Sequence, residues 1–139
     1  MAQNLSGFFA QNKVKTENVF YPASKSFLDE TGSTLQWELR ALTTDEDSKL
    51  RDSCQTVEVS KKRQTVSFNS AMYQQKMVAK SVVFPDLLNA DLQDSYGVKN
   101  EIELLGKMLL PGEFADLFAK VSELCGFDSI DEQVEEVKN

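Results

Sequence analysis

LLGKMLLPGEFADLFAKVSELCGF, residues 104–127, contains a helix whose start, end and buried face can all be recognised. Pro111 suits a first helical position, because its missing N–H would be unpaired there, and Glu113 places negative charge near the positive end of the helix dipole. Apolar residues then recur with a helical period at Phe114, Leu117, Phe118, Val121, Leu124 and Cys125. Gly126 follows, where a left-handed residue commonly ends a helix. The pattern predicts a helix that buries this stripe in the core.

Residues 25–42 have the pattern of a β-hairpin. DETGS at 29–33 supplies the turn residues, and the apolar side chains after it alternate with polar ones. The apolar set is Phe27 before the turn and Leu35, Trp37, Leu39 and Ala41 after it. We expect Phe27 and Trp37 to face the core, because large aromatic side chains chiefly supply buried area. A second, smaller strand pair is predicted at residues 57–68. Val57 and Val59 alternate like a strand, and a basic turn at 60–64 leads to Val66 and Phe68.

Helices are predicted in four other places, at residues 4–10, 44–55, 70–84 and 87–97. The first is so short that Phe8 and Phe9 would have to dock on the core to stabilise it. Thr43 and Glu46 have the spacing of a capping box at the start of the second. The third should end before Pro85, because the residue preceding a proline avoids the α region.

These elements predict a single α+β domain over residues 1–127, in which an N-terminal β-hairpin or small antiparallel sheet packs with several C-terminal helices. Residues 128–139 hold five acidic residues and one lysine, and we expect them to form a mobile acidic tail.

The charge balance disfavours some partners. Fifteen basic and 22 acidic residues give a net charge of −7, which repels nucleic acid and anionic lipid, and no apolar run is long enough to span a bilayer. We therefore expect neither nucleic acid nor a membrane as a partner. An acidic inhibitor or DNA mimic acting on a host enzyme remains an alternative function.

Few residues could support catalysis. The chain has no histidine, the commonest general base and metal ligand, and its six glycines form no phosphate-binding loop. The acidic cluster at 45–47 lacks the spacing of a calcium loop. Cys54 and Cys125 have no metal-binding spacing, and we interpret them as buried thiols. We predict a non-enzymatic protein without a cofactor or metal.

Three strings, read together, resemble a known family. They are SKSFLDETGSTLQWELRALT at 24–43, VVFPDLLNADLQDSYGV at 82–98 and ELLGKMLLPGEFADLFAKV at 103–121. The chain is similar to the XkdN-like phage tail assembly chaperones over most of its length and in the family's order.

This resemblance implies a protein of a phage or prophage, used to assemble a tail that is usually contractile, in the cytoplasm of the bacterial host and absent from the finished virion. The implied partner is the tape measure protein, with the tail tube protein as a second one. The family also suggests a longer form, made by ribosomal frameshifting, that extends the tail after residue 127. The oligomeric state stays open.

Met77, Tyr96 and Met108 are our candidates for contact with a client protein. Methionine adapts to varied apolar partners, and tyrosine is amphipathic. The alternative interpretation is that the methionines fill gaps in the core. Because the stripe after Pro111 is assigned to the core, we expect the client site beside it, around Met108 and the segment after Pro85.

Overall fold

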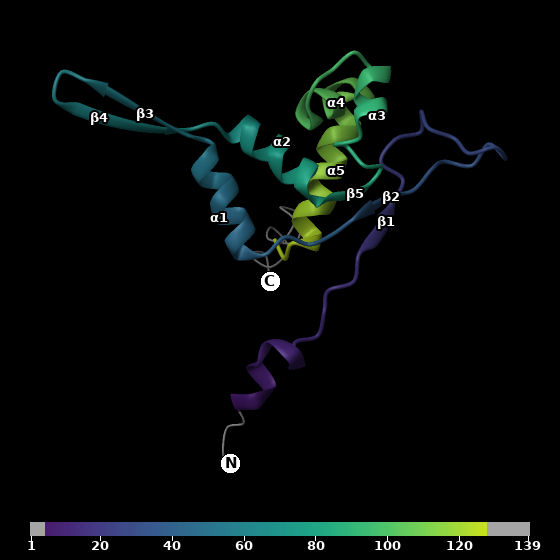
Figure 1. Cartoon of the computed structure of the whole chain (residues 1–139), viewed down its shortest axis with the longest axis horizontal. Coiled ribbons are helices and arrows are strands. Elements are labelled where there is room, and N and C mark those ends of the chain that lie inside the picture. Colours follow the sequence, from purple (N-terminus) through teal and green to yellow (C-terminus); the bar gives the residue numbers. More distant parts are fainter. Residues whose placement is uncertain (1–4, 128–139) are drawn as a thin grey trace, which may run out of the picture.

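Helix α2 (Ser70–Ser81) lies at the centre of residues 5–127, which are the residues that the computed structural model describes (Figure 1). Asn69 caps it, because the Asn69 side-chain oxygen accepts a 3.0 Å hydrogen bond from the backbone N–H of Met72. Three helices pack against it: α1 (Thr44–Ser53), α4 (Glu101–Met108) and α5 (Pro111–Leu124). The buried side chains of α2 are Tyr73, Met77, Val78 and Ser81.

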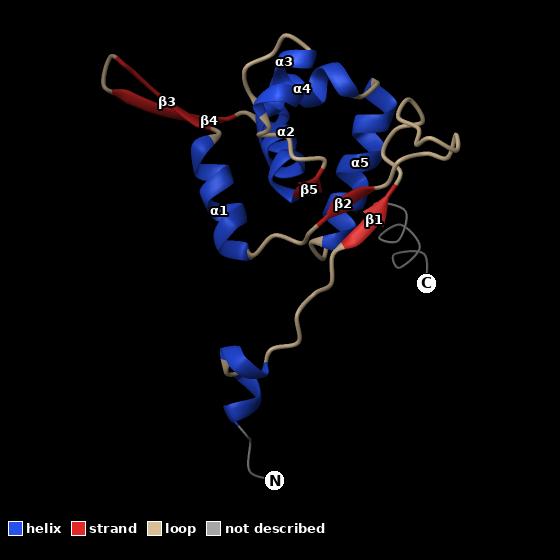
Figure 2. Cartoon of the chain, turned by 45° about the vertical axis from the view of Figure 1, so that its right-hand side comes forward, coloured by secondary structure: helices blue, strands red, loops and turns tan. Residues whose placement is uncertain are grey.

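A three-stranded antiparallel sheet lies beside these helices (Figure 2). Its strands, in spatial order, are β1 (Val19–Tyr21), β2 (Trp37–Leu39) and β5 (Val82–Phe84). Trp37 and Leu39 on the central strand are 2% and 0% exposed, so one face of the sheet closes the core. The prediction that Trp37 belongs to the core is confirmed, and Phe27 is half-buried against that core.

A second sheet consists of β3 (Gln55–Ser60) and β4 (Arg63–Phe68) alone. This β3–β4 hairpin projects from the junction of α1 and α2, away from the other elements (Figures 1 and 2). Its two turn residues, Lys61 and Lys62, have φ angles of 40° and 73°. The second strand pair was predicted from the sequence, and the structure confirms it.

The C-terminal helices agree with the sequence pattern. The short helix α3 (Ala90–Ser95) precedes α4, and Pro111 is the first residue of α5. The Glu113 carboxylate accepts a 2.9 Å hydrogen bond from the Leu110 N–H, so it caps the start of α5. Gly126 has a φ of 95°, as a residue that ends a helix commonly does. Leu117 and Val121 are fully buried.

The sheet differs from the prediction for residues 25–42. The turn at 29–33 is in the expected place, but only Leu28 and Thr34 form a β-bridge across it. The strand that pairs with β2 is β1, which lies earlier in the chain. Because strand hydrogen bonds do not continue along both arms of this turn, the predicted alternation of buried and exposed residues does not hold. Leu35 was expected to face the core, but it is 43% exposed. Residues 82–84 were expected to be helical, but they form β5, because their backbone groups pair with β2.

Three further expectations need correction or lie outside the structure. The N-terminal segment forms the 3-10 helices η1 (Leu5–Phe8) and η2 (Ala10–Asn12), and Phe8 is 86% exposed, so it does not dock on the core. Cys54 is buried, but Cys125 is only half-buried. The acidic tail predicted at 128–139 lies outside the described residues.

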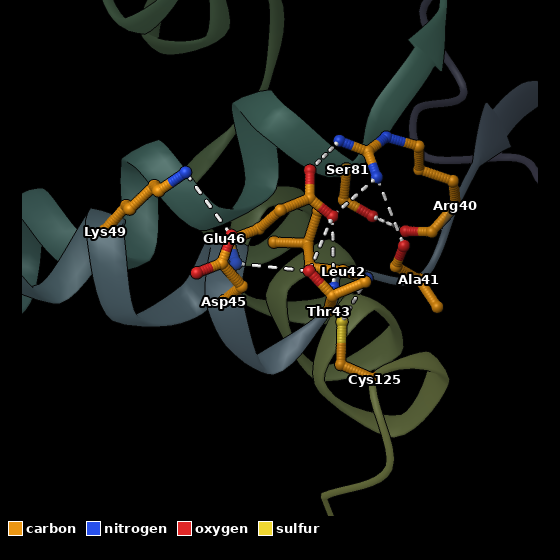
Figure 3. A network of polar contacts seen from close by, with 9 residues as sticks. All are labelled: Arg40, Ala41, Leu42, Thr43, Asp45, Glu46, Lys49, Ser81 and Cys125. Atoms are coloured by element: carbon orange, nitrogen blue, oxygen red, sulfur yellow. Dashed lines mark hydrogen bonds and ion pairs between the residues drawn. The ribbon is translucent and has the colours of Figure 1, made fainter. Parts of the chain in front are cut away.

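A polar network connects β2, α1 and the end of α2 (Figure 3). The Arg40 guanidinium donates to both carboxylate oxygens of Glu46, at 3.1 and 2.6 Å. Glu46 also accepts from the Thr43 N–H at 3.1 Å and donates its own N–H to the Thr43 hydroxyl, which completes the predicted capping box. On the other side of Arg40, its backbone N–H donates to the carbonyl of the fully buried Ser81 at 2.9 Å. Arg40 therefore links the sheet to two helices.

This network predicts a dependence of stability on pH. The hydrogen bonds from Arg40 lower the pKa of Glu46 from 4.5 to about 2. Because the pKa of Glu46 is lower in the folded state than in the unfolded state, ionised Glu46 stabilises the fold. Its contribution to the free energy of unfolding is complete above about pH 5 and is lost as the pH falls toward 2. Allowing for solvent screening, we expect Glu46→Gln to reduce the free energy of unfolding by about 1–2 kcal/mol at pH 7 and to flatten its dependence on pH below 5. Urea unfolding from pH 3 to 7 measures both effects.

Asp45→Asn is the matched control, because Asp45 forms only an exposed ion pair with Lys49. Equal effects of the two substitutions would show that the Arg40–Glu46 pair has no special role.

The packing of α5 gives a second prediction. Leu117 is fully buried, so Leu117→Ala should leave a cavity and lower the free energy of unfolding by about 2–5 kcal/mol. Leu88→Ala, at a position that is 72% exposed, should change it by less than about 0.5 kcal/mol. Urea denaturation at neutral pH measures both variants. Similar losses would contradict the assignment of the α5 stripe to the core.

Candidate functional site

An apolar groove of about 480 Å³ opens between the sheet, the β1–β2 loop, α3 and the end of α4. We call it the apolar groove. Its lining residues are Phe27, Leu35, Gln36, Trp37, Phe84, Pro85, Leu92, Ser95, Tyr96 and Met108. Eight of these ten side chains are apolar or aromatic. A concave site of this size and composition suits apolar side chains of a ligand or a partner.

Local sequence explains how the loop side of the groove is built. The Asp29 carboxylate accepts hydrogen bonds from the backbone N–H groups of Thr31 and Ser33, at 2.8 and 3.0 Å, and a third from the Thr31 hydroxyl. The bond from the Thr31 hydroxyl and the bonds from the backbone lower the pKa of Asp29. The turn brings Phe27 and Leu35 together, since the Leu35 N–H donates to the Phe27 carbonyl at 2.8 Å. Both side chains consequently line the same edge of the groove.

The opposite edge depends on β5. Strand β5 pairs with β2, with Phe84 opposite Glu38, and both Phe84 and Trp37 line the groove. Pro85 follows and directs the chain toward α3. Within that turn the Gln93 amide donates to the Leu87 carbonyl at 2.8 Å, which holds the segment against the start of α3. Phe84 is 59% exposed, so a large aromatic surface at the groove is left uncovered. Exposed apolar area of this kind commonly marks an interaction site.

The segments that form the groove are acidic. Residues 27–37 and 84–96 supply nine of its ten lining residues. Between them they carry Asp29, Glu30, Asp86, Asp91 and Asp94, and neither segment contains a basic residue. None of these carboxylates lines the groove itself, and Asp86 borders another cavity, so the groove is an apolar site within two segments of net negative charge. Such segments favour a partner whose apolar residues are flanked by lysine or arginine.

The candidate client contacts separate into two groups. Tyr96 and Met108 both line the apolar groove, where the site was expected. Met77 is 1% exposed in the middle of α2 and borders a different, small cavity of about 60 Å³. Leu35 and Phe84 were not among the candidates, because alternation assigned Leu35 to the core and Phe84 was assigned to a helix. Whether any of these residues contacts a client stays a prediction.

Another cavity, of about 530 Å³, lies between α1, α2 and the segment after β5. Its lining mixes three lysines with three acidic residues, which are Lys49, Lys76 and Lys80 with Glu46, Asp86 and Glu101. Solvated side chains of both signs select no particular ligand, so we favour the apolar groove as the binding site. In the described part of the chain no cluster of acidic or cysteine side chains could hold a metal ion. No helix described there has the length and apolarity to cross a membrane.

The β3–β4 hairpin is a second exposed surface, and its base is firmly held. The Asn69 N–H donates to the Cys54 carbonyl at 2.8 Å, and the Phe68 ring packs on Tyr73 at 5.6 Å between centroids. Tyr73 in turn donates to Asp47 of α1, and burial together with this bond raises the Tyr73 pKa to about 12. All twelve strand residues of the hairpin, including Phe68 at its base, are exposed.

Comparison with known proteins assigns the chain to a family. The model of the phage XkdN-like tail assembly chaperone proteins matches residues 5–138. The phage-like element PBSX protein XkdN of Bacillus subtilis strain 168 is 28% identical over 139 residues, covering 98% of this chain and 94% of that protein. The uncharacterized protein YqbN of the same strain is 27% identical over 135 residues, covering 96% of this chain and 91% of YqbN.

The fold agrees with this assignment. The crystal structure of YqbN matches with a TM-score of 0.79 and 25% identity, over 92% of this chain and 100% of that chain. The resemblance carried by the three strings is thus confirmed, and the chain belongs to the family of phage XkdN-like tail assembly chaperones.

Proposed function

We propose that this protein binds the tape measure protein of a phage or phage-like tail and keeps it soluble until tail tube subunits replace the chaperone. The observation that carries this proposal is the apolar groove, whose lining is aromatic and aliphatic and whose surroundings are acidic. The protein would act by binding and not by catalysis, in the cytoplasm of the bacterial host, and would be absent from the finished virion. The tail would be of the contractile type.

The physical problem is to protect a long helical client. A helix with an exposed apolar stripe aggregates unless the stripe is covered, and a groove that receives side chains at i, i+3, i+4 and i+7 can cover one segment of it. Phe84 and Leu35 lie exposed at the groove, while Trp37 and Met108 form its buried floor. Such a site gives the client apolar contact at little cost in rearrangement.

Release is as important as binding. A groove of about 480 Å³ covers only a few side chains, so each contact should be weak and reversible. The acidic residues of 27–37 and 84–96 would favour client segments whose apolar stripe is flanked by basic residues, and they would keep neighbouring chaperones apart on one client. Tail tube subunits could then displace the chaperones one by one.

A charge placed in the groove tests this proposal. Leu35 is 43% exposed, so Leu35→Asp should fold, but it would set an unpaired carboxylate against the client's apolar stripe. We expect it to weaken client binding at least tenfold, since burial of one leucine side chain contributes about 1.5–3 kcal/mol. The measurement is the soluble fraction of the tape measure protein from the same gene cluster, co-expressed with each variant.

Leu88→Asp is the matched control, because Leu88 is exposed but does not line the groove. It should solubilise the client as well as the unmodified protein does. Equal solubilisation by both variants would place the client elsewhere on the surface. A client that is equally insoluble with and without the unmodified protein would refute the chaperone function itself.

A further inference from the structure

The β3–β4 hairpin has one apolar and one polar face. Directly opposed residues of an antiparallel pair share a face, and the register pairs Val57 with Val66, Val59 with Gln64 and Gln55 with Phe68. The other face carries Thr56, Ser67, Glu58, Thr65, Ser60 and Arg63, all of them polar or charged. Neither face is covered by another described element, so the apolar face lies open to solvent.

An uncovered apolar face is unfavourable on a sheet of only two strands. A lone two-stranded hairpin is marginally stable in water, and it normally gains stability by packing one face on another surface. Here Val59 is 77% exposed and Val66 is 56% exposed. Phe68, at the base, packs on the ring of Tyr73. The hairpin is therefore built to meet an apolar surface outside its own domain.

The hairpin is also the basic part of an acidic protein. Residues 55–68 contain three basic residues and one acidic residue, a net charge of +2. Because the whole chain carries −7, the other residues carry −9. Lys61 and Lys62 occupy left-handed turn positions, with φ angles of 40° and 73°, where Asn-Gly would fit with less strain. The two cations therefore lie at the tip of the hairpin.

We propose that the β3–β4 hairpin of one copy docks in the apolar groove of a second copy. The chemistry of the two surfaces is complementary, since the valines would meet the aromatic lining and the turn residues Lys61 and Lys62 would meet the acidic segments 27–37 and 84–96. Each copy presents one hairpin and one groove. The contact is thus heterologous, with a different surface contributed by each partner.

The positions of the two surfaces decide what such a contact builds. Figure 1 shows the hairpin at one end of the long axis and the β1–β2 loop, which forms an edge of the groove, at the other. A chain cannot fill its own groove in this arrangement. Repetition of the contact gives a head-to-tail row of copies that closes into a ring only if the rotation between neighbours permits it.

The contact is small. Six-residue strands are about 20 Å long, so the buried area stays below the roughly 1,200 Å² of a stable interface. We therefore expect a weak association that depends on concentration and weakens at least threefold when salt rises from 50 to 500 mM. The groove would be covered by neighbouring copies when no client is present. This inference extends beyond the proposed function, because self-association does not require the client.

Sedimentation velocity of the full chain, without client, tests this contact. The unmodified protein should form species larger than a monomer as its concentration rises. Val59→Asp on the apolar face and Leu35→Asp in the groove should each be monomeric. Ser67→Asp places the same charge on the polar face of the same hairpin, which does not enter the groove, so it should still associate where Val59→Asp does not.

Mixing the two monomeric variants gives the decisive result. Val59→Asp keeps an intact groove and Leu35→Asp keeps an intact hairpin, so an equimolar mixture should form one-to-one dimers and nothing larger. A mixture that stays monomeric while the unmodified protein associates would overturn the proposal. Association of Leu35→Asp by itself would indicate hairpin-to-hairpin contact and would overturn it as well. An unmodified protein that is monomeric up to about 1 mM, which corresponds to only about −4 kcal/mol, would also overturn it.

The two proposals fail separately. Val59→Asp leaves the groove unchanged, so it should still keep the tape measure protein soluble on co-expression. Loss of self-association with retained solubilisation supports the docking contact whatever the role of the client. Loss of both activities in this variant would mean that the hairpin contacts the client, which contradicts docking in a second copy.

Discussion

Hydrogen bonds between Arg40 and Ser81 fix the point where α2 ends and β5 begins. The Arg40 N–H donates to the Ser81 carbonyl, and the Ser81 hydroxyl donates back to the Arg40 carbonyl. Ser81 is fully buried, so its hydroxyl and carbonyl groups would lose their hydrogen-bond partners if the segment around Arg40 moved away. The Arg40 side chain meanwhile binds Glu46 at the start of α1. One residue therefore sets the position of the sheet and the direction of the helix that leads to the hairpin (Figure 3).

Both exposed surfaces depend on this junction. On one side, β5 pairs with β2 and brings Phe84 and the segment after it to the groove. On the other side, α1 leads into the β3–β4 hairpin, whose base is held by Tyr73 of α2. The core between them consists of buried apolar side chains, while the groove and the hairpin keep apolar side chains exposed. A protein that only had to fold would not leave such surfaces uncovered.

The sequence predicts best where local chemistry decides the structure. The ends of α5 and the capping box at Thr43 follow from short-range hydrogen bonds and backbone preferences, and the structure confirms both. Strand β5 could not be predicted, because its three apolar residues continue the helical pattern and only pairing with β2 makes them a strand. Periodicity placed Met77 on an apolar face correctly, but it could not show that α4 and α5 cover that face. The sequence did indicate the region in which Tyr96 and Met108 line the groove. The segment after Pro85 lacks a regular helical pattern, so it was expected at the edge of the helical core.

Hydrogen–deuterium exchange of the chaperone, alone and with its tape measure protein, tests the central claim that clients bind in the apolar groove. We expect slower amide exchange on client binding in residues 27–37 and 84–96, which supply nine of the ten residues that line the groove. Exchange in α1 should stay unchanged. Protection confined to α1 or to α5, with no change in 27–37 and 84–96, would show that the client binds elsewhere.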